Sequence, residues 1–210
     1  MKQSRQIDWT KFVGALVLIL LIMVGCDSPQ KLSPLTEDAV ILAFGDSLTY
    51  GTGAKQAQSY PAVLSILIDR TVINSGIPGE ETSKGMKRLP GVLDEHQPSL
   101  LILCHGGNDI IRKRNHKQTV KNLVAMIKMA QERNIEVVLV GVPAYGLFLS
   151  TADFYREVAE EFNLPFEGEA LSNILANNSL KSDMIHPNGK GYRIFAKAIA
   201  DLLREEGVIK

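Results

Sequence analysis

A serine, a histidine and an aspartate are spaced in this sequence so that they could form a nucleophilic centre. Ser47 lies in the stretch GDSL, directly after the apolar run 39–44. A serine hydroxyl is a weak nucleophile and needs a histidine base whose tautomer is fixed by a third group. His186 follows Asp183 by three residues in the stretch DMIHP, so the carboxylate can accept a hydrogen bond from Nδ1 within one turn. This spacing predicts Ser47 as nucleophile, His186 as base and Asp183 as its orienting partner.

Plainer structural roles are open to the same residues. Asp46 or Ser47 could cap the helix that follows, since both types are common helix caps. Asp183 could be a turn residue. Among the other histidines, His105 is the strongest rival base because it adjoins a glycine-rich stretch. The remaining two histidines are expected in surface loops: His96 and His116.

Short apolar runs alternate with segments of helical period, which predicts a parallel sheet covered by helices. We therefore expect an α/β fold, a three-layer α/β/α sandwich with a mostly parallel, flavodoxin-like sheet. The expected strands are 40–44, 71–74, 100–104, 137–140 and, more weakly, 164–166. The expected helices are 60–69, 119–133, 151–162 and 189–205.

Three loops that follow the first three strands carry the residues of chemical interest. They are the GDSL stretch around Ser47, the segment 74–79 and the GGND stretch at 106–109. The carboxyl ends of neighbouring parallel strands open onto one edge of a sheet, where ligands bind. Glycines in each loop permit close approach of the backbone. We therefore expect the three loops to meet at a single site.

Four blocks in this order resemble the GDSL or SGNH hydrolase family, in its bacterial branch of small esterases, arylesterases, thioesterases and lysophospholipases. The blocks are GDSL, the segment 74–79, GGND and DMIHP, and the resemblance covers about 39–203. It implies the SGNH hydrolase fold and a Ser-His-Asp triad. It also implies an oxyanion hole formed by the backbone N–H groups of Ser47 and Gly76 and by the side-chain amide of Asn108. His105, before the third block, departs from the small or apolar residues that also occur there in relatives.

Charge and motif content argue against several other classes of protein. The chain has 210 residues, with 23 basic and 23 acidic side chains and a formal net charge of zero. A nucleic-acid partner is therefore not expected. The sequence has neither clustered zinc-type ligands nor a dinucleotide-binding glycine fingerprint, so we expect no metal and no organic cofactor.

The N-terminus has the features of an export signal. Basic residues precede an apolar run at 12–24, which is shorter than the ~20 residues of a bilayer-spanning helix. The run is followed by Cys26 in a stretch, MVGC, that resembles the lipobox of bacterial lipoproteins. This resemblance implies that Cys26 becomes lipidated and anchors the protein to a membrane. An uncleaved N-terminal anchor is the alternative.

These features divide the chain into a signal peptide at 1–26, a tether at 27–38 and a hydrolase domain at 39–210. The domain is expected to face the bacterial periplasm, and Asp27 favours the inner membrane by resemblance to known sorting rules. With Cys26 lipidated, Cys104 would have no intramolecular partner and would be a small buried residue.

The apolar loop 141–149 is expected to rise beside the same sheet edge. Tyr145, Leu147 and Phe148 could then line a pocket for an acyl or aryl group, although packing of the loop against the domain is an equally plain interpretation. The expected activity is hydrolysis of carboxylic esters: aryl or acyl esters, lysophospholipids and acyl thioesters. The alternatives are a deacetylase of cell-wall or exported polysaccharide and a non-catalytic ligand-binding lipoprotein.

Overall fold

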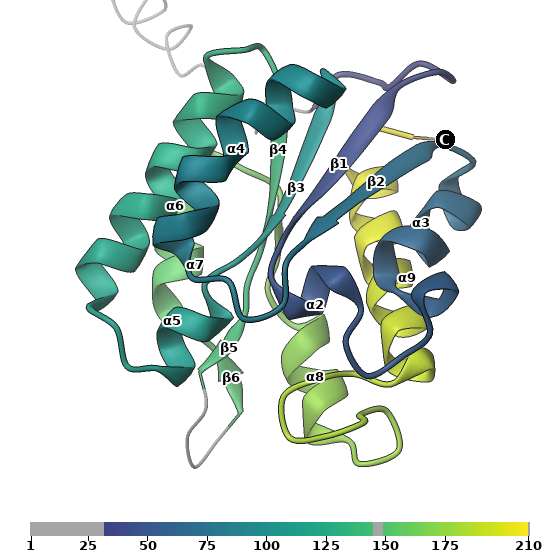
Figure 1. Cartoon of the computed structure of the whole chain (residues 1–210). Helices are drawn as coiled ribbons and strands as arrows, with labels where there is room; N and C mark the ends of the chain where they lie inside the picture. The colour runs from purple at the N-terminus through teal and green to yellow at the C-terminus, as the bar shows by residue number, and fades with distance from the viewer. Residues whose placement is uncertain (1–31, 145–148, 210) are drawn as a thin grey trace, which may run out of the picture. The chain divides into compact units, whose positions relative to one another are not determined.

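A parallel sheet of five strands forms the centre of the part of the chain that this computed structural model describes, residues 32–144 and 149–209 (Figure 1). The strand order is β2-β1-β3-β4-β7, and every pair is parallel. The bounds are β1 (Val40–Gly45), β2 (Thr71–Gly76), β3 (Leu100–Cys104), β4 (Glu136–Val140) and β7 (Phe166–Glu167).

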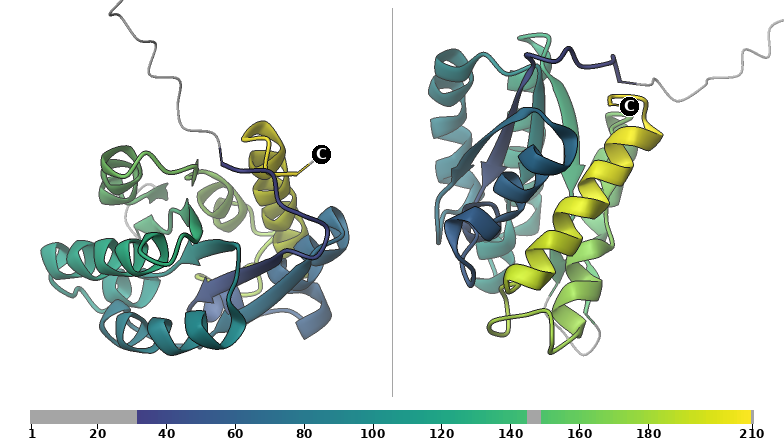
Figure 2. Two further views of the ribbon diagram at one scale, coloured as in Figure 1. Left: turned by 90° about the horizontal axis from the view of Figure 1, so that it is seen from above. Right: turned by 90° about the vertical axis from the view of Figure 1, so that its right-hand side faces the viewer.

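Helices cover both faces of this sheet, which confirms the expected three-layer sandwich (Figures 1 and 2). One layer contains α3 (Tyr60–Ile68), α8 (Ala170–Ala176) and α9 (Gly189–Glu205), and the other contains α4 (Thr82–His96), α6 (His116–Gln131) and α7 (Asp153–Glu161). Shorter elements complete the described fold: α2 (Ser47–Tyr50), η1 (Gln56–Gln58), α5 (Gly107–Ile111) and the antiparallel pair β5 (Pro143–Ala144) and β6 (Ser150–Thr151).

The central strands form where the sequence is apolar at consecutive positions. Every residue of β3 is fully buried, as are Ile41, Leu42, Ala43 and Phe44 of β1. Both strands have a neighbour on each side and helices above and below, so neither face meets water. The carboxyl ends of β1, β2 and β3 lie at the same end of the sheet as α2 and α5 (Figure 1). The loops that follow these strands therefore lie at the edge of the sheet where a site was expected.

Several elements differ from the sequence-based expectations. Helix α4 was not expected, because Pro90 and two glycines interrupt its helical pattern; the structure carries Pro90 inside the helix. His96 and His116 were expected in loops, but His96 ends α4 and His116 begins α6. The early start of α6 has a clear cause: the side chain of Asn115 accepts a hydrogen bond from the N–H of Gln118 and caps the helix.

Two boundaries differ more modestly. The helix expected at 151–162 begins at Asp153, because Thr151 pairs with Pro143 in the small antiparallel sheet. The strand expected at 164–166 is found as β7, over Phe166–Glu167.

The start of the described chain lies against the folded domain. The N–H of Leu35 donates to the carbonyl of Val208 at 2.8 Å, and the N–H of Ser33 donates to Glu136 at 2.8 Å. The expected signal peptide 1–26, which includes Cys26, and the loop residues Tyr145, Leu147 and Phe148 lie outside the described residues. Among the helices that are described, none is both long and apolar enough to cross a membrane.

Candidate active site

Ser47 is placed by the sharp exit of β1 into α2. Gly45 ends the strand where a Cβ atom would lie 1.9 Å from the carbonyl oxygen of Cys104, so a side chain cannot be accommodated there without a backbone shift. Asp46 then caps α2, since its Oδ1 accepts from the N–H of Leu48 at 3.0 Å. The cap is therefore Asp46, and the hydroxyl of Ser47 is directed elsewhere.

The Ser47 hydroxyl meets His186. Ser47 Oγ lies 3.0 Å from His186 Nε2, and His186 Nδ1 lies 2.8 Å from Asp183 Oδ2. Because Nδ1 donates to the carboxylate, Nε2 is left to accept the proton of the serine hydroxyl. The structure thus brings Ser47 together with the Asp183–His186 turn, whose histidine is 139 residues away from it in the sequence, in the geometry of an activated serine.

Asp183 is itself held by the turn that carries His186. Its Oδ1 accepts from the N–H groups of Ile185 and His186, both at 2.8 Å. Partial burial acts to raise the pKa of Asp183, but hydrogen bonds from the His186 ring and these backbone groups outweigh it, so the pKa is lowered. Asp183 is therefore an anionic partner that favours the Nδ1–H tautomer of His186.

The loop that holds this turn is tied to the start of α9. Asn188 caps the helix by accepting from the N–H groups of Lys190 and Gly191, and its amide donates to the carbonyls of Ser179 and Lys181. One side chain thus fixes both the helix start and the preceding loop. The position of the His186 ring is set by the longest helix of the described fold rather than by a free loop.

Gly76 lies at the end of β2, opposite Gly45 in the register of the sheet. A Cβ atom at Gly76 would lie 2.1 Å from the backbone nitrogen of Tyr50, so the two loops approach as closely as only glycine permits. The N–H of Gly76 donates to the side-chain oxygen of Asn74 at 3.0 Å. An oxyanion bound there would have to replace or share this acceptor.

Asn108 lies in α5, and its amide reaches two oxygen atoms. Nδ2 donates to the backbone carbonyl of Glu80 at 3.0 Å and to Asp46 Oδ2 at 3.3 Å. Asp46 is buried, which raises the pKa of its carboxyl group against the opposing effect of nearby His105. The amide of Asn108 is therefore oriented from two sides beside Ser47.

Ser47, His186 and Asn108 surround one small hollow. Its volume is about 10 Å³, close to the space that one water molecule requires. Polar groups and apolar side chains share its wall, which comprises Asp46, Ser47, Leu48, Gly107, Asn108, Ile111, Ile185 and His186. A substrate larger than the reacting carbonyl must therefore extend over the surface around the hollow.

His105 does not contact Ser47, as an alternative base would have to do. Its ring is fully buried, its Nδ1 accepts from the N–H of Gly106 at 2.9 Å and its Nε2 lies 3.3 Å from Glu80 Oε2. The hydroxyl of Ser47 is met by His186 instead. The sequence did not indicate Glu80 as the partner of His105, because the two residues are 25 positions apart and meet only in the folded domain.

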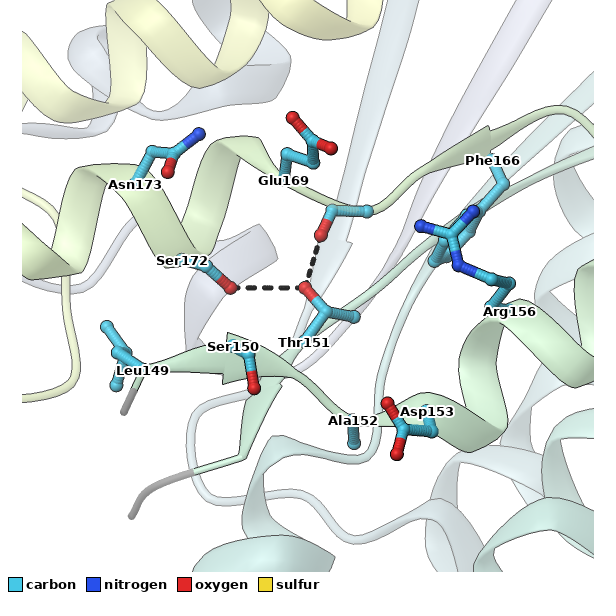
Figure 3. Close-up of a pocket in the computed structure, with 11 residues that line it drawn as sticks. Leu149, Ser150, Thr151, Ala152, Asp153, Arg156, Phe166, Glu169, Ser172 and Asn173 are labelled. Atoms are coloured by element: carbon cyan, nitrogen blue, oxygen red, sulfur yellow. Dashed lines mark hydrogen bonds between the residues drawn. The ribbon is translucent and has the colours of Figure 1, made fainter. Parts of the chain in front are cut away.

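A larger pocket lies beside β6 and α8 (Figure 3). It has a volume of about 300 Å³, and Ser47, Asp183 and His186 are not among the residues that line it. Thr151 Oγ1 donates to the carbonyl of Gly168 and lies 3.1 Å from Ser172 Oγ, so these polar groups join β6 to α8 (Figure 3). Across the described residues, no group of three or more His, Cys, Asp or Glu side chains is arranged to hold a metal ion.

Comparison with known proteins places this geometry in context. Residues 43–194 match the GDSL-like Lipase/Acylhydrolase family. This range includes Ser47, Gly76, Asn108, Asp183 and His186. An arylesterase from Vibrio mimicus is 28% identical over 200 residues, which cover 90% of this chain and 96% of the relative. The Escherichia coli K12 protein named thioesterase 1/protease 1/lysophospholipase L1 is 30% identical, over 78% of this chain and 83% of the relative.

The fold is also found among solved structures. The psychrotrophic esterase EstA from Pseudoalteromonas sp. superposes with a TM-score of 0.71 and 25% sequence identity. The superposition covers 80% of this chain and 98% of the esterase. That esterase was crystallised inhibited by monoethylphosphonate, and its likeness agrees with the sandwich expected from the sequence.

Proposed function

Because this chain belongs to the GDSL-like lipase/acylhydrolase family and is an ester hydrolase, we propose that it cleaves carboxylic esters with Ser47, His186 and Asp183 as a catalytic triad. The observation that carries this proposal is the continuous chain of contacts from Ser47 Oγ to His186 Nε2 and from His186 Nδ1 to Asp183, at 3.0 Å and 2.8 Å. A binding protein that does not react with its ligand has no need for this arrangement.

The first half of the reaction forms an acyl-enzyme. Ser47 Oγ attacks the ester carbonyl carbon while His186 Nε2 takes the hydroxyl proton, and the carbonyl oxygen becomes an oxyanion. Asp183 stabilises the imidazolium that forms. When the tetrahedral intermediate collapses, the bond to the leaving oxygen breaks and His186 donates its proton to the departing alcohol.

The second half returns the free enzyme. A water molecule attacks the acyl carbon, His186 takes one of its protons, and a second oxyanion forms at the same carbonyl oxygen. Collapse of this intermediate breaks the bond to Ser47 Oγ, which takes a proton from His186. The products are one carboxylic acid and one alcohol; the original proton of Ser47 leaves with the alcohol, and a proton from water replaces it.

Three donors are proposed for the oxyanion. The N–H of Ser47 lies in the first turn of α2, where backbone N–H groups have no acceptor within the helix. The N–H of Gly76 would exchange the side-chain oxygen of Asn74 for the oxyanion. The amide of Asn108 is a neutral donor beside the hollow, and it would likewise exchange one of its two acceptors, Asp46 Oδ2 or the Glu80 carbonyl, for the oxyanion. Losing one donor of this kind typically lowers kcat by ~10²–10³-fold.

Apolar side chains around the site support substrates with an acyl or aryl group. Tyr50, Ile77, Ile111 and Met184 are exposed, with Met184 82% exposed, and each lies within three residues of a proposed catalytic or oxyanion residue. Of these, Ile111 lines the hollow itself, and an exposed apolar side chain at a reactive centre is suited to bind an apolar group. We therefore propose aryl and acyl esters as substrates, with lysophospholipids and acyl thioesters as further members of this class.

A lipid anchor on Cys26, in a protein that faces the periplasm, is proposed from the sequence of the export segment alone. It would hold the domain near membrane lipids, including lysophospholipids. Mass spectrometry of the mature N-terminus, together with membrane fractionation of Cys26→Ala, tests the anchor. An unmodified Cys26 in the mature protein would contradict it.

The triad is tested with p-nitrophenyl esters of short and long acyl chains. The detergent-solubilised full chain is compared with Ser47→Ala and with Ser150→Ala, which changes an exposed serine away from the hollow. Turnover and labelling by a serine-directed phosphonate are expected for the wild type and Ser150→Ala and are expected to vanish in Ser47→Ala. Turnover that persists in Ser47→Ala would refute the proposed nucleophile.

A further inference from the structure

A largely buried ion pair lies behind two of the proposed oxyanion donors, Gly76 at the end of β2 and Asn108 in α5. Arg88 projects from α4 and forms a fork on Glu80, with Nε 3.1 Å from Oε1 and Nη2 2.7 Å from Oε2. The Glu80 side chain is 6% exposed and that of Arg88 is 22% exposed. The guanidinium also stacks 4.0 Å from the centre of the Phe44 ring. Its orientation is therefore restricted by the carboxylate and by the ring.

The remaining donors of Arg88 hold the residue before Gly76. Nη1 donates to Ser75 Oγ at 2.7 Å, and Nη2 donates to the backbone carbonyl of Ser75 at 3.2 Å. That carbonyl belongs to the same peptide group as the N–H of Gly76. A trans peptide group is planar, with its C=O and N–H in opposite directions. An arginine that fixes the carbonyl therefore also fixes the direction of the Gly76 N–H.

Glu80 connects the same arginine to the second donor. While the Glu80 carboxylate binds Arg88, its backbone carbonyl accepts from Asn108 Nδ2 at 3.0 Å. His105 adds a third contact, 3.3 Å from Glu80 Oε2, and is fully buried immediately before the stretch that contains Asn108. The side chain of Glu80 is thus anchored at both oxygen atoms, and its carbonyl is a fixed acceptor for the Asn108 amide.

We propose that Arg88 is a positioning residue for the oxyanion hole, which orients the Gly76 N–H through the Ser75 peptide and the Asn108 amide through Glu80. This inference rests on the proposed function, because it presumes that Gly76 and Asn108 stabilise an oxyanion. These two donors come from β2 and α5, and both elements contact the segment formed by α4 and the loop before it. A single planar cation that bonds to both sides sets the separation of the two donors.

The chemistry of the contact explains why arginine occupies this position. A lysine offers a compact ammonium group, which cannot bind both carboxylate oxygens and the Ser75 carbonyl in one plane. If this ion pair served stability alone, packed apolar residues of similar volume could often replace it without loss of stability. Displacement of oxyanion donors, in contrast, is costly, since a misplacement of about 1 Å can lower a rate ~10²-fold.

Arg88→Lys in the full chain tests this role against a matched control. Arg133→Lys is the control, because Arg133 also pairs with a carboxylate, that of Asp94 in α4, but does not line the hollow. The kcat for a p-nitrophenyl ester is measured per active site titrated with a serine-directed phosphonate, well below the melting temperature. Arg88→Lys is expected to lower kcat by about 10- to 100-fold with KM changed by less than about threefold. Arg133→Lys is expected to match the wild type.

A double variant asks whether Arg88 acts through the oxyanion hole. If it does, Arg88→Lys combined with Asn108→Ala loses less kcat than the product of the two single losses, because both changes affect the same donor. Ser75→Ala removes one hydrogen bond of Arg88 and keeps the ion pair, so it is expected to lower kcat in the same direction but less. If Arg88→Lys does not fold, Ser75→Ala alone tests whether Arg88 positions the oxyanion hole.

The proposal is overturned if kcat per titrated site is unchanged in Arg88→Lys, or if the losses in the double variant multiply. With Arg88→Lys unfolded, a wild-type kcat in Ser75→Ala overturns it. Failure of the underlying function has a different signature, because the wild type itself would then neither hydrolyse the ester nor react with the phosphonate.

Discussion

Asp46 Oδ2 lies 3.3 Å from Asn108 Nδ2, so the residue before the proposed nucleophile contacts the proposed oxyanion donor. The other carboxylate oxygen of Asp46 caps α2 through the N–H of Leu48. One buried side chain therefore links the start of the helix that carries Ser47 to the side chain that faces it across the hollow. The GDSL stretch therefore supplies both the proposed nucleophile, Ser47, and a side chain, Asp46, that holds Asn108 in place.

Asp46→Ala is expected to lower both stability and activity. Loss of the cap should reduce the free energy of unfolding by about 1 kcal/mol. Loss of the contact with Asn108 should lower kcat, by less than the ~10²–10³-fold that follows direct removal of an oxyanion donor. Urea denaturation and kcat per titrated site measure the two effects. Ser47→Ala is the comparison, because it keeps the cap; it should abolish turnover with little change in stability, and a clear loss of stability there would instead assign a capping role to the hydroxyl.

Asp183→Asn is expected to remove most of the activity while the fold is retained. An asparagine amide facing His186 Nδ1 favours the tautomer that carries its proton on Nε2, which cannot then accept the proton of Ser47. The expected loss in kcat approaches ~10⁴-fold. Steady-state kinetics with a p-nitrophenyl ester measure it. Asp201→Asn changes an aspartate on α9 that pairs with Lys197 and should behave as the wild type; an Asp183→Asn enzyme with near-normal kcat would exclude Asp183 from the triad.

The sheet and the motif loops could be predicted from sequence because their signals are local. The apolar runs of β1 and β3 are continuous, and Ser47, Gly76 and Asn108 lie at or within a few residues of the carboxyl ends of strands. Helix α4 could not be predicted in this way, since Gly85, Pro90 and Gly91 obscure its apolar face. Gly85 has a tertiary reason, because a Cβ atom there would lie 2.3 Å from His105 Nε2. Such a requirement is visible only when α4 is packed against His105, the residue that follows β3.

The contacts behind the oxyanion donors were beyond sequence reasoning for a related reason. Asn108 is bound by a backbone carbonyl, that of Glu80, and any residue type could supply that atom. Arg88 is a single basic residue in a helix with other basic residues, and its contacts with Ser75 and Glu80 depend on the turn between β2 and α4. The start of α6 was predicted too late, at 119 rather than at His116, although Asn115, a common capping residue, stands directly before the helix.

Glu80 is expected to make stability depend on pH in the acidic range. Burial acts to raise the pKa of Glu80, but hydrogen bonds from His105 and Arg88 outweigh it and hold the pKa at about 2, below the ordinary value of 4.5. A carboxyl group with a lowered pKa stabilises the fold above its unfolded-state value and loses this contribution as the pH falls toward the folded-state value. The difference corresponds to up to ~3 kcal/mol.

Urea denaturation at several pH values between about 5 and 2 measures this contribution. The free energy of unfolding of the wild type should fall over this range. Glu80→Gln should be less stable at pH 5 and should lose less on acidification. Glu205→Gln, a change at an exposed position of α9, is the control and should follow the wild type. Parallel curves for Glu80→Gln and the wild type would show that Glu80 does not carry this dependence.

Ile111→Ser is expected to weaken the preference for long acyl chains. Ile111 lines the hollow and is 44% exposed, so an acyl chain that leaves the small space at Ser47 can lie against it. Each methylene buried against an apolar surface contributes ~0.8 kcal/mol, so kcat/KM for long-chain p-nitrophenyl esters should fall several-fold while that for the acetyl ester changes little. Ile66→Ser is the matched control, because Ile66 is 79% exposed on α3 and does not line the hollow. An equal loss for short and long esters in Ile111→Ser would show that Ile111 supports the reacting groups rather than the acyl chain.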